Sequence, residues 1–553
     1  MDAIRELSSA ASEIGRVADD ATAKIDPALR AAGDSPAARV HLLDVTATEL
    51  EHVVARLETL DVGSRGFLFP PLSGARDEFL RRIDEAKGDA ADGRRYIAAL
   101  RRFLVGPQRS LILAATNAEM TAGSGMPNSG GIATTLNGDI DLGVFVQNEK
   151  AYLDVNGIEP PGDLPKLYGN FGMGYDFRGT TASPNFPTLA PLMQRMALRA
   201  APFGAVENIF VVDAFVLRDV LKVVGPVEVE GTSYTSDNVV EEVLNRNYLR
   251  FGNTLDDPTM RGQRAELQAD VARAAFNAMK ERHIDISRLV QLLADDAKGR
   301  HLLAWSADPD LEQFWDRVGA SGRLRPDGFM ISAENAGGNK IDWYLRPHAD
   351  VKIRRVGDWY QFDVDVTIDN QPRNPTSQQI EGTVPEKHHV MLDLHLPERA
   401  VDVVSFDQPF KAVGADPPMR AANLLYTIPL GTSKTMHFQF FLPSDESTIT
   451  VLPSARVAPL TITLNGQQLN DAIPRTIVLS RVAPYDVATW WGIIGLLLLG
   501  TGMGIAGSGL AARATISGQP DRRSRARFEL GWWLCLLGTA TIVVQAALMV
   551  QAT

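Results

Sequence analysis

The amino-acid sequence predicts a multidomain α+β protein with four parts in order along the chain. They are a helical N-terminal stalk or bundle (1–104), an α/β layer domain (105–340), an immunoglobulin-like β-sandwich (341–482) and a C-terminal two-helix transmembrane hairpin. Three observations predict this order: apolar residues first recur at helical spacing, short strands then alternate with helices, and the apolar period finally changes to two. With 553 residues the chain is also too long for a single hydrophobic core.

The N-terminal stalk is predicted from a narrow apolar stripe. Apolar side chains near the N-terminus recur at alternating spacings of three and four, which is the pattern of one helix face: Ile4, Leu7, Ala11, Ile14, Val17, Ala21 and Ile25. Pro27 is expected to break this helix. Similar patterns follow over 41–60, 79–86 and 96–103, so we expect helices that pack on one another or on a second copy.

The α/β layer domain is predicted from alternating strands and helices. The apolar run 209–212 predicts a buried strand, and residues 214–224 predict a helix that the following Gly-Pro pair ends. The dipeptide Asn137-Gly138 predicts a tight β-hairpin. Further helices are expected over 238–248, 262–282 and 287–297.

The β-sandwich is predicted from strict alternation after residue 340. Phe362, Val364, Val366 and Ile368 alternate with polar residues, as they would on a strand with one face on a core. The same alternation recurs over 390–396, 436–442 and 460–464, with Pro and Gly turns between the segments. Several short strands without a helix are typical of an immunoglobulin-like sandwich.

The transmembrane hairpin is predicted from two apolar segments, 486–512 and 529–551, which each contain about 20 or more uncharged residues in a row. The loop 513–528 between them carries five arginines, and short basic loops stay in the cytoplasm. We therefore expect a cell-membrane protein whose body is extracytoplasmic, with the lipid bilayer as a partner. Because no signal peptide precedes the body, we also expect an upstream transmembrane segment that this chain lacks. A cytoplasmic body is the alternative.

Composition excludes several classes of function. The formal net charge of −12 argues against nucleic acid as a partner, because nucleic acid attracts basic surfaces. The one cysteine, Cys535, allows no intrachain disulfide and no cysteine metal site. The sequence has no Walker loop, no dinucleotide-binding fingerprint and no His-Glu-x-x-His motif, so we expect neither a cofactor nor a metal.

A glycine-rich segment resembles a known family. The likeness lies in Asn117-Ala118-Glu119-Met120 and Gly123-Ser124-Gly125-Met126, which resemble the opening signature of the domain of unknown function 4012 family in its actinobacterial form. Pieces within 177–187, 225–227, 245–248, 299–306 and 337–345 resemble the same family in the same order. The resemblance implies a membrane-anchored extracytoplasmic protein associated with envelope polysaccharides. Its α/β part is distantly similar in layout to the LytR-CpsA-Psr transferases, which move a polyprenyl-phosphate-linked glycan onto the cell wall.

If the chain is such a transferase, cations and carboxylates must surround the transferring phosphate. The candidate ligand-binding residues are Asn117, Glu119, Gly123, Gly125, Asp176, Arg178, Arg246 and Arg300, and no catalytic residue is assigned. The glycines would offer backbone amides to an anion. Thr121 stands where the family usually has an arginine, which weakens this interpretation. The alternative is that the glycines serve turns, that Asp176 and Arg178 form a surface ion pair, and that the polar groups satisfy backbone amides.

Three functions therefore remain open. The favoured one is a membrane-anchored extracytoplasmic cell-envelope protein, a non-catalytic scaffold or binding protein of polysaccharide assembly whose partner is a lipid-linked glycan or another membrane protein. The second is a LytR-CpsA-Psr-like glycopolymer phosphotransferase, which requires the candidate arginines and carboxylates to converge on one apolar groove. The third is a structural subunit of a larger membrane complex.

Overall fold

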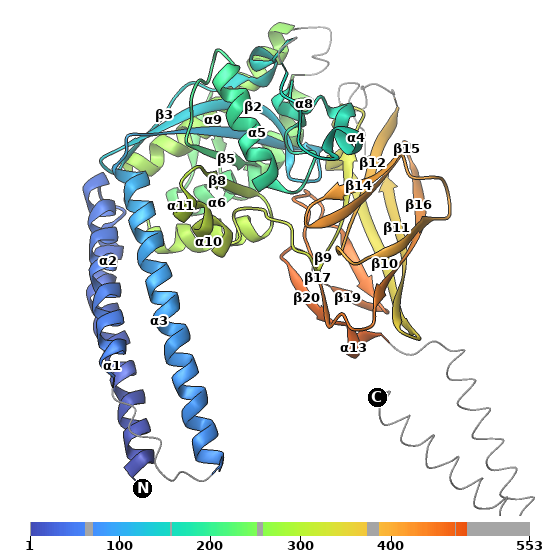
Figure 1. Ribbon diagram of the computed structural model, residues 1–553. Helices are drawn as coiled ribbons and strands as arrows, with labels where there is room; N and C mark the ends of the chain where they lie inside the picture. Colours follow the sequence, from blue (N-terminus) through green and yellow to red (C-terminus); the bar gives the residue numbers. More distant parts are fainter. Residues whose placement is uncertain are drawn as a thin grey trace, which may run out of the picture.

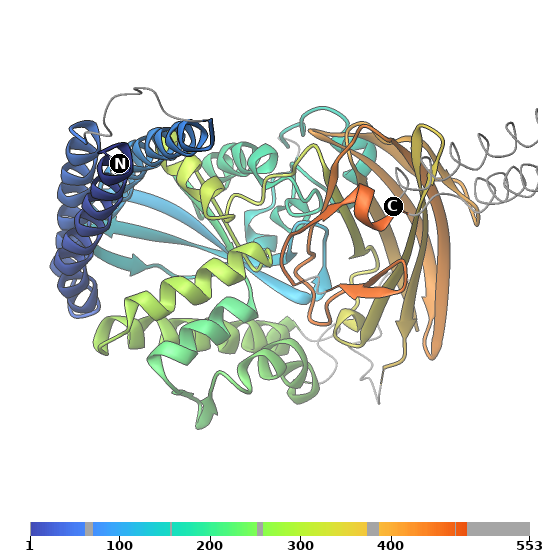
Figure 2. The same cartoon turned by 90° about the horizontal axis from the view of Figure 1, so that it is seen from below.

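The computed structural model describes residues 2–60, 70–154, 157–251, 258–372, 386–469 and 472–483. Figure 1 shows three parts: long N-terminal helices at one side, a mixed α/β part in the middle, and a β-sandwich at the other side. Figure 2 shows the same order from below, with the mixed sheet between the helices and the sandwich.

The N-terminal part consists of three long helices: α1 (Asp2–Ala31), α2 (Pro36–Glu58) and α3 (Pro70–Val105). Helix α2 packs on both α1 and α3. The start of α2 follows from its sequence, because the Ser35 hydroxyl accepts a hydrogen bond from the Ala38 amide at 3.1 Å and proline occupies the first helical position. The predicted break at Pro27 is wrong: α1 continues through it. A proline removes one backbone donor, and here it does so only near the end of a long helix.

A mixed sheet forms the centre of the second part, with the strand order β3-β2-β1-β5-β8 and β4 paired to β2. Strands β1 and β5 are parallel, and β1 with β2, β2 with β3, β2 with β4 and β5 with β8 are antiparallel. The hairpin predicted at Asn137-Gly138 is confirmed, since both residues have positive φ angles of 52° and 82° between β2 and β3. The strands are β1 (Gln108–Met120), β2 (Gly125–Leu136), β3 (Asp139–Leu142), β4 (Val146–Gln147), β5 (Asn208–Val212) and β8 (Leu302–Ser306).

Helices cover both faces of this sheet. Ile209, Val211 and Leu303 share a buried cluster with α5, while Phe210 and Ala304 share another with the region of α10 and α11. Helix α6 spans Ala214–Val224 as predicted, capped by Asp213 and ended by Gly225 at φ +80°. The larger helices are α5 (Phe186–Arg199), α6, α9 (Pro258–Glu281), α10 (Ile286–Lys298) and α11 (Pro309–Arg317). The shorter elements are η1 (Asn148–Ala151), α4 (Leu164–Tyr168), η2 (Gly169–Phe171), η3 (Phe177–Gly179), β6 (Val227–Val229), β7 (Thr232–Tyr234), α7 (Val239–Glu241), the π-helix η4 (Glu242–Arg246) and α8 (Asn247–Arg250).

The third part is a sandwich of two six-stranded sheets, ordered β13-β16-β11-β10-β18-β19 and β14-β15-β12-β9-β17-β20. It begins at Gly328, earlier than the predicted boundary at 341. An immunoglobulin domain has seven or nine strands in antiparallel sheets, whereas β10 with β18 and β9 with β17 are parallel pairs. The immunoglobulin-like description is therefore too specific. The elements are β9 (Gly328–Asn335), η5 (Ile341–Trp343), β10 (Leu345–Val356), β11 (Trp359–Asn370), β12 (Lys387–Leu396), β13 (Val401–Ser405), β14 (Ala412–Asp416), β15 (Met419–Pro429), β16 (Thr432–Pro443), β17 (Thr448–Val451), β18 (Thr461–Leu464), β19 (Gln467–Leu469), β20 (Arg475–Val478) and α13 (Leu479–Val482).

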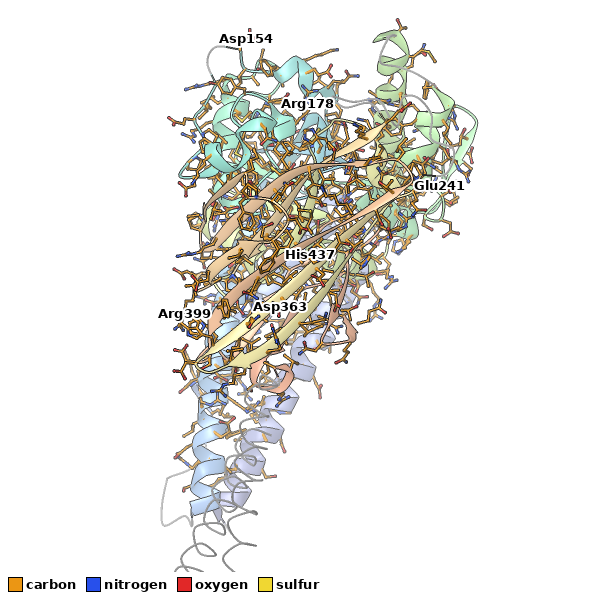
Figure 3. The ribbon with its side chains drawn as sticks, turned by 90° about the vertical axis from the view of Figure 1, so that its right-hand side faces the viewer. Asp154, Arg178, Glu241, Asp363, Arg399 and His437 are labelled. Atoms are coloured by element: carbon orange, nitrogen blue, oxygen red, sulfur yellow. The ribbon has the colours of Figure 1, made fainter. Side chains whose placement is uncertain are left out.

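The two sheets of the sandwich differ in what covers them. On β11, Phe362 and Val364 point into the core between the sheets, whereas Asp363 lies on the outward face, where Figure 3 also places His437 of β16. The sheet that contains β12 is buried on both faces: Leu392 packs in the sandwich core, and Met391 packs in the core of the α/β part. Each such buried side chain contributes about 1.5–3 kcal/mol, so the two parts share a substantial apolar contact.

The predicted fold class needs correction at its C-terminal end. Among the described residues no helix is both long and apolar enough to cross a bilayer. The long helices α1, α3 and α9 carry charged side chains along their length, and charges in a bilayer core are costly. The transmembrane hairpin therefore has no support in this structure, and the segments from which it was predicted (486–512, 513–528 and 529–551) lie outside the described residues.

Candidate functional site

The predicted glycine-rich site is a buried turn between β1 and β2. The Gly123 amide donates to the Thr181 carbonyl at 2.8 Å, and the Thr121 hydroxyl donates to the Ser124 carbonyl at 2.9 Å. The Gly125 carbonyl in turn accepts a hydrogen bond from the Thr181 hydroxyl at 3.1 Å. Thr121 and Ser124 are fully buried, and the backbone and hydroxyl groups named above are already hydrogen-bonded within the protein. In the described structure the turn therefore does not offer a set of free backbone amides to an anion.

Gly123 is required by close packing. A Cβ atom there would lie 2.8 Å from the carbonyl oxygens of Thr181 and Ser183. Replacing Gly123 by alanine is therefore expected to lower the free energy of unfolding by about 1–3 kcal/mol, measured by urea denaturation of the full chain. Gly88 of α3 is the matched control, because a Cβ there would meet nothing within 4 Å. Gly88→Ala should raise stability by up to about 1 kcal/mol, and equal effects of the two substitutions would contradict this account.

Asn117 joins three segments at the end of β1. Its side-chain amide donates at 2.7 Å to the Asp213 carboxylate and at 2.7 Å to the carbonyl of Ala455 in the sandwich. Asp213 also caps α6 through the Phe215 amide at 2.9 Å and contacts the His301 ring at 2.6 Å. Asn117 therefore holds the α/β part to the sandwich.

Glu119 lies in a polar cluster of its own. Its carboxylate accepts a hydrogen bond from Asn128 at 3.0 Å and forms a buried ion pair with Lys340. The Lys340 ammonium is 5.9 Å from the ring centre of Tyr248, and the Arg264 guanidinium covers the same ring at 4.4 Å. Glu119 is thus already neutralised by a protein cation.

The three candidate arginines contact different groups. Arg178 pairs with Asp176 at 2.6 Å and with Glu149 at 3.3 Å, and the hydrogen bonds that its guanidinium donates to the Asp176 carboxylate raise the pKa of Arg178. Arg246 of the π-helix η4 is more than half exposed and pairs with Glu241 at 3.0 Å and Glu242 at 3.1 Å. Figure 3 shows Arg178 near the top of the molecule and Glu241 at a separate edge.

Arg300 is buried, with a left-handed φ of +66°. Its guanidinium donates to the carbonyl of Gly322 at 3.2 Å, to that of Gly123 at 3.4 Å, and to that of Pro184. Burial lowers the pKa of Arg300 to about 10. Among the described residues the candidates thus form separate structural contacts: Asp176 pairs with Arg178, and Arg300 donates to the Gly123 carbonyl. Arg300 binds the chain carbonyls that a phosphate would need to displace.

A pocket that contains none of the candidate residues lies in the sandwich part, beside the contact of Tyr344 with Asn245 of the α/β part. It has a volume of about 560 Å³ and is lined by Trp343, Tyr344, Arg346, Asp369 and Gln371. The segment 337–345, which resembles the family, contains both aromatic residues, but the resemblance implies no role for them. The signal available in the sequence was the Trp-Tyr pair directly before an alternating strand.

A second missed group is a set of buried acids between the two parts. Glu334 of β9 and Asp393 of β12 are fully buried, and their carboxyl groups lie beside each other. Burial raises the pKa of both carboxyl groups, and the neighbouring charge of Asp393 adds to the rise at Glu334. Close by, the His395 ring lies 3.1 Å from the Tyr168 hydroxyl and 3.2 Å from Asp416.

Comparison with known proteins identifies one matching family. Residues 105–248 match the family model described as "Protein of unknown function (DUF4012)". The family likeness predicted from Asn117–Met126 is thus confirmed over this segment, which contains β1, β2 and the π-helix η4. No curated protein and no solved structure matches the chain. The similarity in layout to the LytR-CpsA-Psr transferases stays a prediction.

Proposed function

We propose that this chain is a non-catalytic binding or scaffold protein of the cell envelope that acts in polysaccharide assembly outside the cytoplasm. The observation that carries the proposal is the pairing of the candidate cations. Arg178 and Arg246 are each neutralised by two carboxylates, and Arg300 is committed to backbone carbonyls. A phosphotransferase needs cations that face a common site and stabilise charge on the transferring group.

The envelope role rests on the family resemblance, and the binding role rests on the build of the chain. Two parts that share buried contacts present a continuous surface, and ligand pockets occur preferentially at such junctions. The pocket beside Trp343 is lined by residues of the sandwich part, and one of them, Tyr344, contacts Asn245 of the α/β part. A protein that holds a glycan or another envelope protein needs such a surface and no reacting groups.

The test compares binding with turnover for one probe, a polyprenyl-diphosphate-linked oligosaccharide. Purified full-length protein is incubated with the probe, and native mass spectrometry follows both the bound complex and the release of polyprenyl phosphate. We expect a complex with the glycan portion and no release. Arg178→Ala and Arg246→Ala should change the affinity by less than about tenfold, since both side chains are engaged by carboxylates of the protein and not by the ligand.

Two results would overturn the proposal. Release of polyprenyl phosphate by the wild type that is lost in Arg178→Ala would favour the phosphotransferase. The second result is a protein that binds neither the probe nor its free oligosaccharide and copurifies with a second polypeptide in a fixed ratio. This result would favour the structural subunit of a larger complex.

A further inference from the structure

The pocket at the junction has the chemistry of a sugar site. Its lining contains two aromatic rings, a guanidinium, a carboxylate and an amide, from Trp343, Tyr344, Arg346, Asp369 and Gln371. Trp343, Tyr344 and Asp369 are half-buried, and the other two side chains are exposed. We propose that this pocket binds a hydroxyl-rich glycan segment, which deepens the proposed function and rests on it.

The lining discriminates between classes of ligand. None of its residues is aliphatic, so a prenyl chain would find aromatic edges and charges instead of an apolar groove. A phosphate would find one cation, Arg346, and a carboxylate, Asp369, opposite it in the β10–β11 register. A pyranose ring suits this mixture, because its C–H face packs on an aromatic ring while its hydroxyls both donate and accept hydrogen bonds.

The backbone turn that carries the aromatic pair, and the Tyr344 hydroxyl, are held in place before any ligand arrives. Arg346 donates to the carbonyls of Trp343 at 3.0 Å and Leu345 at 2.8 Å, which fixes the short η5 turn. The Tyr344 hydroxyl donates to the Asn245 side chain at 3.2 Å, and Asn245 belongs to the π-helix η4 of the other part. π-helices are rare and frequently found at functional sites. A turn and a tyrosine that are held in this way reduce the ordering cost of binding.

The test uses the full-length protein and a panel of soluble oligosaccharides of four to eight hexose or pentose units, by isothermal titration calorimetry. Trp343→Ala is expected to weaken binding of the best panel member at least about tenfold, while Trp343→Phe keeps most of it. Asp369→Asn, which keeps the shape of the side chain, should also weaken binding. Trp359→Ala is the matched control, because Trp359 is 40% exposed at the opposite end of β11 and should leave the affinity unchanged.

The outcomes separate this inference from the proposed function. Wild-type binding that persists in both Trp343→Ala and Asp369→Asn overturns the site and leaves the binding function standing. Equal losses in Trp343→Ala and Trp359→Ala also overturn the site. A wild type that binds no member of the panel overturns the glycan site, and the carrier-lipid experiment then decides the function. Thermal unfolding of each variant tests whether the fold is kept. If Trp343→Ala does not fold, Asp369→Asn alone tests the site.

Discussion

Replacing Asp342 by alanine is expected to lower the free energy of unfolding by about 3–5 kcal/mol. Asp342 is fully buried, and its carboxylate pairs at 2.7 Å with Arg456, whose side chain is also buried. The same carboxylate accepts hydrogen bonds from Asn335 at 2.8 Å and from the Met120 amide at the end of β1 at 3.2 Å. Removal of the acid leaves a buried guanidinium without a carboxylate partner among the described residues, while its hydrogen bond to the Ala333 carbonyl at 2.6 Å remains.

Urea denaturation followed by tryptophan fluorescence measures this effect. Asp445→Ala is the control, because the Asp445–Arg399 pair is exposed and its loss should cost less than about 1 kcal/mol. The double replacement of Asp342 by alanine and Arg456 by methionine should recover part of the loss, since no unpaired charge then remains buried. A double variant that is as unstable as the sum of its single variants would contradict the ion-pair explanation. An Asp342→Ala variant as stable as the Asp445→Ala control would contradict it as well.

Those elements that carry their own signals could be predicted from the sequence. Helix α6 has an aspartate cap, an apolar face and a glycine stop, and all three lie within the helix or directly next to it in the sequence. The alternation of Phe362, Val364 and Val366 on β11 likewise reports one buried face. Asp176 and Arg178 are two residues apart, so their ion pair could also be anticipated.

Long-range contacts could not be predicted in the same way. Asp393 and His395 alternate with leucines on β12, and alternation assigns such polar residues to an outward face. In the structure that face is covered by the α/β part, so both residues are fully buried. Arg300 shows the same limit, because its carbonyl partners lie at Gly123, Pro184 and Gly322, far from it in the sequence. The periodicity of a sequence shows which face of a strand or helix is polar. It does not show whether another part of the protein packs on that face.

The buried pair Glu334 and Asp393 should make the protein less stable as the pH rises. The folded state raises the pKa of Glu334, chiefly through burial and then through the neighbouring Asp393, so the folded chain retains a proton that the unfolded chain releases. Where the unfolded state binds fewer protons, the free energy of unfolding falls by about 1.4 kcal/mol per pH unit for each proton. Stability from this pair is therefore greatest below the unfolded pKa of about 4.3 and is lost above it.

Glu334→Gln isolates this contribution. A glutamine amide can donate to Asp393 at every pH and so replaces the proton that the pair must otherwise share. Tyr168, His395, Asp416 and Lys411 face the pair from neighbouring segments and stay unchanged in the variant. We expect the difference in free energy of unfolding, variant minus wild type, to grow with pH between about 5 and 8 in favour of the variant. Glu398→Gln, an exposed change, should stay within about 0.5 kcal/mol of wild type throughout. A difference curve for Glu334→Gln that is flat with pH would contradict a shared proton at this junction. A curve that falls with pH would mean that the carboxylate form is stabilised by the surrounding donors.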